Sequence, residues 1–340
     1  MVVLGEGEEV MVGEVDGGLR RWGRVRGELG APVAVHRRAV NALARGRDGR
    51  WLASGSSDGS VAVMALPEGV VRARLSESGG HGAVTALSMS PGNEVVAVGY
   101  ADGALLRVDA ASGRPLGAAW ATAQQAVTAL VYSADGGVLW SGGLDGSLLT
   151  FDAASGGRLC SAGAAGGAAH SDSINSLVLR PQGDVLASGG RDGRIRLWAA
   201  AAGGCLRAVG EPLLQHRGGI SSLSFSRDGG LLASGGDDRS VVIWDVERRQ
   251  LLGRPLQSHR RAVTALAFAA GRVLLTGDSE TVWHWSLDES EWTARACERA
   301  GRNLSMAEWR QAFGDRAYCR ICADAPAGGL APSEAPLCPP

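Results

Sequence analysis

The sequence contains no lysine, few aromatic residues and no long hydrophobic run. Its 34 basic residues are all arginines, and they nearly balance 35 acidic residues, which leaves a formal net charge of −1. A balanced charge disfavours binding to nucleic acid or to an anionic membrane surface. No apolar run reaches the roughly 18 residues of a membrane-spanning helix. Without lysine, the Gly-Lys-Ser/Thr end of a phosphate-binding Walker loop is excluded.

The sequence also lacks a secretion signal and a dense cysteine pattern. The first residues, Met1 to Glu6, have neither the positive start nor the apolar block of a signal peptide. Six cysteines among 340 residues are too few for a disulfide framework. We therefore expect a soluble, cytoplasmic protein without a cofactor, in which the cysteines are ordinary free thiols.

One cysteine pair allows an alternative. Cys319 and Cys322 form a Cys-x-x-Cys that could bind zinc together with Cys297 and Cys338. A single pair is a weak signal, because no second Cys-x-x-Cys occurs. The prediction is therefore that no metal is bound.

The sequence does contain a repeated figure. Each copy has an apolar run ending in serine, a turn rich in glycine and aspartate, and an alternating run ending in an aromatic residue, which is the pattern of a β-hairpin. The turn aspartates are Asp16, Asp58, Asp102, Asp145, Asp192 and Asp238. In a seventh copy, which ends at Trp285, Ser279 occupies the place of the aspartate. Successive copies are 41 to 47 residues apart, which is room for about four strands.

This figure resembles the WD40 repeat, whose signature is Gly-His, then Asp, then Trp-Asp. The copy with His216, Asp238 and Trp244-Asp245 comes closest to it, whereas the last copy has His259 without the aspartate. The resemblance covers residues 2–286 in seven copies. It implies an all-β fold, a seven-bladed β-propeller whose blades have about four antiparallel strands.

The pattern changes after residue 286. Residues 287–323 predict a short helical cap: acidic residues begin the segment 288–300 and arginine ends it, and Ser305 with Glu308 forms a capping box for a second helix. Residues 324–340 are rich in proline, alanine and glycine and are predicted to be disordered.

The same tail carries a second resemblance, to the C-terminal cap of bacterial WD40 proteins, many of which are STAND-type signalling NTPases. The residues that carry it are Glu291-Trp292, Ala296-Cys297, Asn303-Leu304-Ser305, Glu308-Trp309, Gly314-Asp315, Tyr318 and Cys322. Cys319 departs from that pattern. The resemblance implies that this chain is the C-terminal part of a larger protein whose ATPase segment lies elsewhere.

The start of the chain predicts an incompletely closed ring. Val2 to Leu4 aligns with the innermost strand of a blade, so nothing precedes it to supply an outer strand for blade seven. Blade seven should then have three strands from its own repeat. Its outer edge, Val282 to Trp285, would be bare or covered by Trp292 or Trp309, because a bare apolar edge invites aggregation.

Two repeats contain a complete set of polar residues with one aromatic residue. The sets are His170, Ser188, Asp192 and Trp198, and His216, Ser234, Asp238 and Trp244. Histidine, serine and aspartate together also suggest a hydrolase, and residues 55–59 match a nucleophile elbow, although that motif needs a strand-to-helix turn. In WD40 propellers the corresponding four residues form a buried hydrogen-bond chain. That resemblance implies a structural role, and no catalytic residues.

The loops between strands carry exposed charge. Arg38, Arg191, Asp237, Arg239 and Arg261 fall in the loops that, by the resemblance, surround one end of the central channel. We predict that they form a partner-binding face for proteins or peptides, acidic ones in particular. The predicted function is a non-catalytic interaction scaffold or sensor module. The alternatives are a propeller-fold enzyme of the hydrolase class and a stand-alone adaptor.

Overall fold

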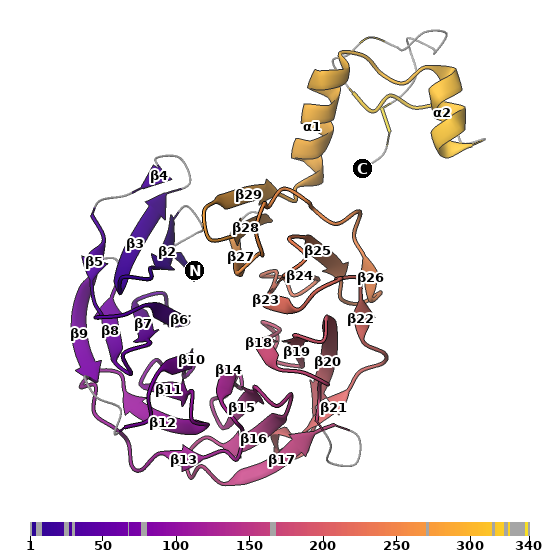
Figure 1. Cartoon of the computed structure of the whole chain (residues 1–340). Helices are drawn as coiled ribbons and strands as arrows, with labels where there is room; N and C mark the ends of the chain where they lie inside the picture. The colour runs from indigo at the N-terminus through magenta and orange to yellow at the C-terminus, as the bar shows by residue number, and fades with distance from the viewer. Residues whose placement is uncertain are drawn as a thin grey trace. The chain divides into compact units, whose positions relative to one another are not determined.

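The structure is a computed structural model, and it describes residues 2–4, 9–23, 27–28, 31–66, 68–75, 80–163, 168–269, 272–314, 317–322, 326 and 337–338. Seven antiparallel sheets follow one another along the chain and are arranged as the blades of a ring (Figure 1). The chain divides into a larger unit, Met1–Ala270 with Leu275–His284, and a smaller unit, Gly271–Leu274 with Trp285–Pro340.

The first four blades begin with their innermost strand and proceed outward. Blade one consists of β1 (Val2–Leu4), β2 (Glu9–Gly13), β3 (Gly18–Gly23) and β4 (Gly27–Glu28), with β5 (Val33–Ala34) also pairing with β3. Blade two consists of β6 (Val40–Arg45), β7 (Trp51–Ser56), β8 (Val61–Ala65) and β9 (Val70–Leu75). Blade three consists of β10 (Val84–Met89), β11 (Val95–Tyr100), β12 (Ala104–Asp109) and β13 (Trp120–Ala121). Blade four consists of β14 (Val127–Tyr132), β15 (Val138–Gly143), β16 (Leu148–Asp152) and β17 (Arg158–Ala162).

The last three blades repeat this order. Blade five consists of β18 (Ile174–Leu179), β19 (Val185–Gly190), β20 (Arg194–Ala200) and β21 (Leu206–Ala208), with the 3-10 turn η2 (Ala202–Gly204) before β21 and β22 (Leu213–Leu214) also on β20. Blade six consists of β23 (Ile220–Phe225), β24 (Leu231–Gly236), β25 (Val241–Asp245) and β26 (Gln250–Leu251). Blade seven consists of β27 (Ala265–Ala269), β28 (Val273–Gly277) and β29 (Val282–Ser286).

The hydrophobic core lies between neighbouring blades. Each blade is a sheet with two apolar faces, so it must pack on both sides. One cluster, for example, combines Ile195 and Leu197 of blade five with Leu232 and Trp244 of blade six. The innermost strands are neighbours around the ring, and β27 of the last blade lies against β1 of the first. The first and last blades meet at these inner strands but share no sheet, and within the described residues blade seven has three strands, as the sequence predicts.

A belt of hydrogen bonds also ties the innermost strands together. The second residue of an innermost strand donates its side-chain hydrogen to a backbone carbonyl of the next blade's inner edge. The pairs are Asn41 to Val84, Thr85 to Val127, Thr128 to Ile174, Asn175 to Ile220 and Ser221 to Val263. Because these donors are short side chains at equivalent positions, each bond fixes the spacing between two blades at the channel wall.

The prediction of free thiols is wrong. All six cysteines are paired, as Cys160–Cys205, Cys297–Cys322 and Cys319–Cys338. Cys160 lies on β17 and Cys205 lies directly before β21. These two residues are 45 apart, which is one blade period, so they occupy corresponding outer edges of adjacent blades. A nearby bond strengthens this junction: Trp140 Nε1–H of blade four donates to the Gly204 carbonyl at 2.9 Å.

The smaller unit contains the two predicted helices, α1 (Glu289–Ala300) and α2 (Met306–Phe313). Ser305 caps α2, and the predicted capping box with Glu308 is present. The side chain of Asn303 donates to the Cys322 carbonyl and accepts from the Cys322 amide, which fixes the segment after α2 beside the disulfide. The cysteines considered for zinc are thus held in two disulfides.

Most of the segment predicted to be disordered, 324–340, lies outside the described residues. Of the part that is described, Cys338 donates its amide hydrogen to the Arg320 carbonyl at 2.9 Å. Neither α1 nor α2 is long and apolar enough to cross a membrane. Covering of the β29 edge by the cap remains a prediction, and the side chain of Trp292 lies outside the described residues.

Candidate functional site

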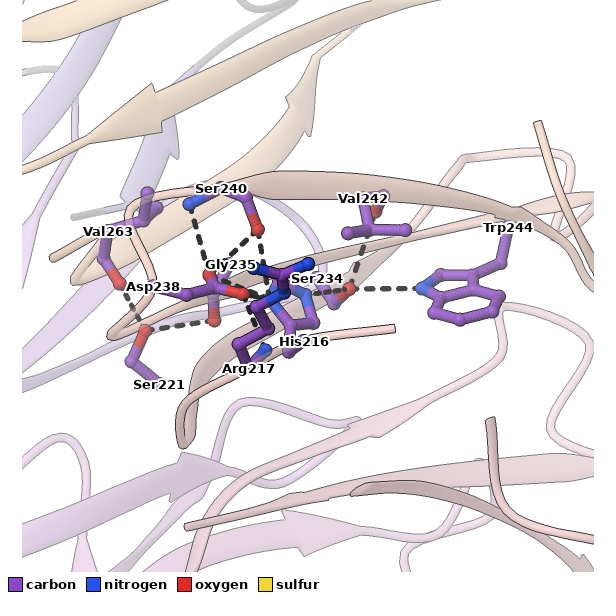
Figure 2. Close-up of polar contacts among 10 residues, drawn as sticks. All are labelled: His216, Arg217, Ser221, Ser234, Gly235, Asp238, Ser240, Val242, Trp244 and Val263. Atoms are coloured by element: carbon purple, nitrogen blue, oxygen red, sulfur yellow. Dashed lines mark hydrogen bonds and ion pairs between the residues drawn. The ribbon is translucent and has the colours of Figure 1, made fainter. Parts of the chain in front are cut away.

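The four polar and aromatic residues of blade six form one continuous hydrogen-bond chain (Figure 2). Trp244 Nε1–H donates to Ser234 Oγ at 3.0 Å, and Ser234 Oγ lies 2.8 Å from His216 Nε2. The other ring nitrogen, Nδ1, lies 3.0 Å from an oxygen of Asp238. With the imidazole proton on Nδ1, every donor meets an acceptor: tryptophan to serine, serine to histidine, histidine to aspartate.

Strand pairing brings these residues together. Ser234 on β24 pairs with Val242 on β25, two residues before Trp244, so both side chains emerge on the same face of the sheet. Asp238 lies in the intervening turn, where it accepts from the amide and hydroxyl of Ser240 and from the amide of Arg217 (Figure 2). The chain therefore anchors the loop before β23 to the β24–β25 turn.

The electrostatics match this arrangement. Burial raises the pKa of the Asp238 carboxyl, but the hydrogen bonds from the Arg217 amide, His216 and Ser240 outweigh it, and the pKa lies below the ordinary value. A carboxylate that stays ionised is the acceptor that the histidine requires. The ion remains near the surface while the serine is fully buried.

Blade five repeats the chain. Trp198 Nε1–H donates to Ser188 Oγ at 2.8 Å, which lies 2.7 Å from His170 Nε2, and His170 Nδ1 lies 3.0 Å from Asp192. The structure thus brings together all eight residues that the sequence predicts to form the two tetrads.

Blade seven differs from its prediction. The sequence predicts no aspartate there, with Ser279 in its place. Instead Asp278, one residue earlier, lies 3.0 Å from His259 Nδ1, and Thr276 replaces the serine at 2.7 Å from Nε2. The amides of Glu280 and Thr281 donate to the same carboxylate. The turn is one residue shorter, and it still brings an aspartate to His259. The residue spacing of the other blades could not predict this contact.

Blade four replaces the histidine by an amide. Gln124 is buried, its Nε2 donates to Ser147 Oγ at 2.9 Å, and its Oε1 accepts from Ser141 Oγ at 2.6 Å. Asp145 then accepts from Ser147. An uncharged side chain can thus perform the connection, so the connection does not depend on histidine chemistry.

Blade three leaves its pair exposed. His81 Nδ1 lies 2.8 Å from Asp102, and the imidazole lies tilted against the Tyr100 ring, with 5.4 Å between centroids. Val98 occupies the position of the tetrad serine, so this blade offers no hydroxyl to the ring there. Blade two is a further variant, in which Ser60 stands between His36 and Asp58.

The buried tetrads do not have the access that a hydrolase needs. Ser188 and Ser234 are 0% exposed, and His170 is 2% exposed. A nucleophile must reach a substrate carbonyl, with donors positioned for the developing oxyanion. The hydroxyl of each serine is instead occupied by a tryptophan N–H and an imidazole. The Gly55 to Gly59 segment joins β7 to β8, so it is not a nucleophile elbow either.

The residues of the predicted partner-binding face lie in loops of four blades. Arg38 precedes β6, Arg191 lies between β19 and β20, Asp237 and Arg239 lie between β24 and β25, and Arg261 precedes β27. All five are exposed. The structure brings only some of them together.

Two local arrangements modify that face. A Cβ placed on Gly219 would meet both Arg191 and Asp237, so these neighbours from blades five and six flank the same loop. Arg261 forms an ion pair with Glu280 at 2.6 Å. Glu280 is a residue that sequence reasoning missed, and its position in the turn opposite the Arg261 loop was the available signal.

We expect acid to destabilise the ring through its buried histidines. Burial lowers the pKa of His170 most strongly, Asp192 opposes this, and Arg196 and Arg194 add to it, so the pKa lies below its usual 6.5. The unfolded chain then binds a proton first, so the stability from neutral His170 is complete above about pH 6.5 and is lost as the pH falls below it. The melting temperature should fall between pH 7.5 and pH 5.

The matched control for this prediction is His170→Gln, which copies Gln124 of blade four. The variant should fold, and its melting temperature should fall less steeply over the same pH range. Part of the slope should remain, because burial also lowers the pKa of His36. An equal slope in wild type and variant would contradict the assignment.

Comparisons with known proteins agree with this architecture. The sequence profile of the WD40 family, described as WD domain, G-beta repeat, matches residues 30–63, 73–106, 167–199 and 208–245. The β-propeller domain of Cps50 (Swd1) from Myceliophteria thermophila superimposes with a TM-score of 0.72 at 19% identity, over 84% of this chain and 96% of that one. No curated protein matches the chain.

The matched stretches end at residue 245, so the relationship of the tail to STAND-type proteins stays a prediction. The repeat profile, the seven sheets and the superposition agree on the rest. The chain folds as a seven-bladed β-propeller, and four of its stretches match the WD40 repeat profile.

Proposed function

We propose that this protein is a non-catalytic interaction scaffold whose recognition surface is the loop face of Arg38, Arg191, Asp237, Arg239 and Arg261. WD40 propellers commonly mediate protein–protein interactions. The observation that carries the proposal is that exposed charged loops are anchored at their base. In blade six the Arg217 amide donates to Asp238 and the Asp237 amide donates to the Gly219 carbonyl, so loop and turn are held together.

Rigid loops with exposed guanidinium groups suit an acidic partner. Arginine binds carboxylates through parallel N–H bonds, and a loop that is already ordered loses little conformational entropy on binding. The signalling role and the place beside a STAND-type ATPase belong to this proposal and are supported by the residue pattern of the tail alone. Catalysis finds no support, because the His-Ser-Asp sets are buried and occupied.

Reversing three arginines tests the proposal. The variant Arg38→Glu/Arg191→Glu/Arg261→Glu should lose the proteins that the wild-type chain captures from its own cells, as identified by mass spectrometry. The reason is electrostatic: three positive contacts become repulsive to an acidic partner. The melting temperature should stay within a few degrees, because the side chains are exposed.

A control with the same change of charge lies on the outer strands. Arg72 on β9, Arg158 on β17 and Arg207 on β21 are exposed and distant from the loops in sequence. Their reversal to glutamate should leave capture intact. Equal loss in both triple variants would indicate a nonspecific charge effect, and capture that survives the loop variant would place recognition elsewhere.

A further inference from the structure

The structure contains a pocket at the junction of blades one and two. Its cavity of about 310 Å³ lies between the segment before β6, the start of β8 and the end of β9. Ligand pockets generally begin near this size, so the space suits one side chain of a partner. The pocket adjoins the loop face, because Arg37 lines it and the next residue is Arg38. An assignment of this pocket to a partner therefore rests on the proposed function.

The inner wall of the pocket is apolar. Val35, Val61, Ala62 and Leu75 line it, and all four are buried. Val61 pairs with Leu75 across β8 and β9, and Val35 comes from the segment that connects blade one to blade two. Short methylene stems can contact this wall, whereas a fully charged or hydrated group would be desolvated there without compensation.

The polar residues that line the pocket carry an excess of positive charge. They are Arg37, Asp58 and Arg74, together with the buried His36. Burial lowers the pKa of His36, so the imidazole is neutral at pH 7. Two guanidinium groups and one carboxylate leave a net charge of one positive unit.

Asp58, the one negative group among the residues that line the pocket, already accepts several hydrogen bonds. Asp58 accepts from the Arg37 amide and from both the amide and the hydroxyl of Ser60. Burial raises its pKa, but the hydrogen bonds from Ser60 and Arg37 outweigh this and lower the pKa to about 2. Asp58 therefore stays ionised and has little need of an incoming cation, which leaves the guanidinium groups as the groups available to a ligand.

A hydrogen bond to a backbone carbonyl holds the Arg74 side chain in position. Its Nη1 donates to the Val35 carbonyl at 2.5 Å, which bridges from blade two to the connecting segment of blade one. One bond leaves the other N–H groups of the planar guanidinium for a ligand. A fixed fork of donors favours a carboxylate, which can accept two parallel bonds.

Arginine at this position distinguishes blade two from its neighbours. In blades two to six, the outermost strand or bridge pairs one residue with the start of the third strand. The pairs are Leu75 with Val61, Trp120 with Leu105, Ala162 with Leu148, Leu213 with Ile195, and Leu256 with Val241. The residue before that partner is Arg74 in blade two. In blades three to six it is Ala119, Ser161, Pro212 and Pro255. The repeat itself therefore does not require a charge here.

We infer that this pocket binds a glutamate or aspartate side chain of an acidic partner segment, with its carboxylate on Arg74 and its methylene groups against Val35, Val61 and Leu75. The pocket would give the loop face one fixed point of recognition. The loop arginines supply charge of low specificity, and the pocket supplies a position that one acidic residue of the partner must occupy.

A peptide selection tests the inference. A library of random 12-residue peptides is selected on the full chain, and the recovered peptides are synthesised. We expect recovered peptides to share a glutamate or aspartate, and Arg74→Gln to weaken their binding about tenfold, as expected for loss of hydrogen bonds to a charged group. Arg72→Gln, on the same strand and outside the pocket, is the matched control and should change binding less than twofold.

Replacement of the shared peptide acid by its amide should weaken binding to wild type by a similar factor and cause little further loss with Arg74→Gln, as a double-mutant cycle requires. Amidation of the peptide C-terminus should have no effect on binding. If it abolishes binding, the pocket binds the terminal carboxylate instead of a side chain, and the inference is wrong. Equal binding by Arg74→Gln and wild type also overturns it. Arg74→Lys keeps the charge, and a melting curve for each variant separates loss of the site from loss of the fold.

The outcome is separable from that of the proposed function. If the loop-face triple variant loses the peptides but Arg74→Gln retains them, the recognition face stands and the pocket assignment falls. If only Arg74→Gln fails to bind the peptides, the pocket is their binding site and the loop arginines are not required for binding.

Discussion

Trp244→Ala lowers the free energy of unfolding by about 3–5 kcal/mol, the range for deletion of a large buried aromatic side chain. Trp244 is 3% exposed and packs between blades five and six in the cluster with Leu197, Leu213 and Phe225. The change removes that packing and leaves the Ser234 hydroxyl without its indole donor. Urea unfolding, monitored by circular dichroism, measures the loss as a lower midpoint.

Blades two and four offer the matched controls for this variant. Met64 and Phe151 occupy the equivalent position there, and both are buried. Trp244→Phe retains most of the apolar volume and loses the hydrogen bond to Ser234, so it should cost about 1–2 kcal/mol. The difference between the alanine and phenylalanine variants then separates packing from hydrogen bonding. An equal loss of unfolding free energy in both variants would contradict the conclusion that packing between blades contributes most of the stability from Trp244.

Removal of the Cys160–Cys205 disulfide lowers the free energy of unfolding by about 2–4 kcal/mol. The bond closes a segment of 45 residues, and a cross-link over that length removes loop entropy worth about 4 kcal/mol from the unfolded chain. Measured effects usually fall below this value, because the unfolded state retains some structure. The double variant Cys160→Ser/Cys205→Ser, compared with wild type in urea without reductant, measures the loss.

The double variant isolates this bond from the two disulfides of the smaller unit. Reductant should lower the stability of the ring in wild type and leave that of the double variant nearly unchanged, if the other two bonds stabilise only their own unit. Thiol alkylation of the native, unreduced protein followed by mass spectrometry should modify no cysteine. Alkylation of Cys160 or Cys205 before reduction would show that the bond does not form.

Several features of the fold were predictable because they depend on local pattern. Alternation of apolar residues and a glycine- and aspartate-rich turn determine a hairpin from residues close in sequence. Repetition of this hairpin at one period implies blades that must pack on each other, because each blade has two apolar faces. The tetrads of blades five and six were predictable for the same reason, since their residues lie within one repeat.

Other features required the tertiary structure. Asp278 contacts His259 because the turn in blade seven is one residue shorter, and a spacing learned from the other blades could not reveal it. The capping box at Ser305 and Glu308, in contrast, lies within four residues and was predicted correctly. Contacts within one turn or hairpin are thus predictable when the turn has the same length in every copy.

The sequence by itself determined the repeat, its hairpins and the polar chains of blades five and six, because these arise from contacts inside a unit of about four strands. Only the tertiary structure decided which residues of different units meet. Cys160 and Cys205 become partners, and Arg74 reaches the Val35 carbonyl, because ring packing places the edge of one blade against the next. Such contacts depend on the curvature and spacing of the whole ring, which arise from the packing of all seven blades together.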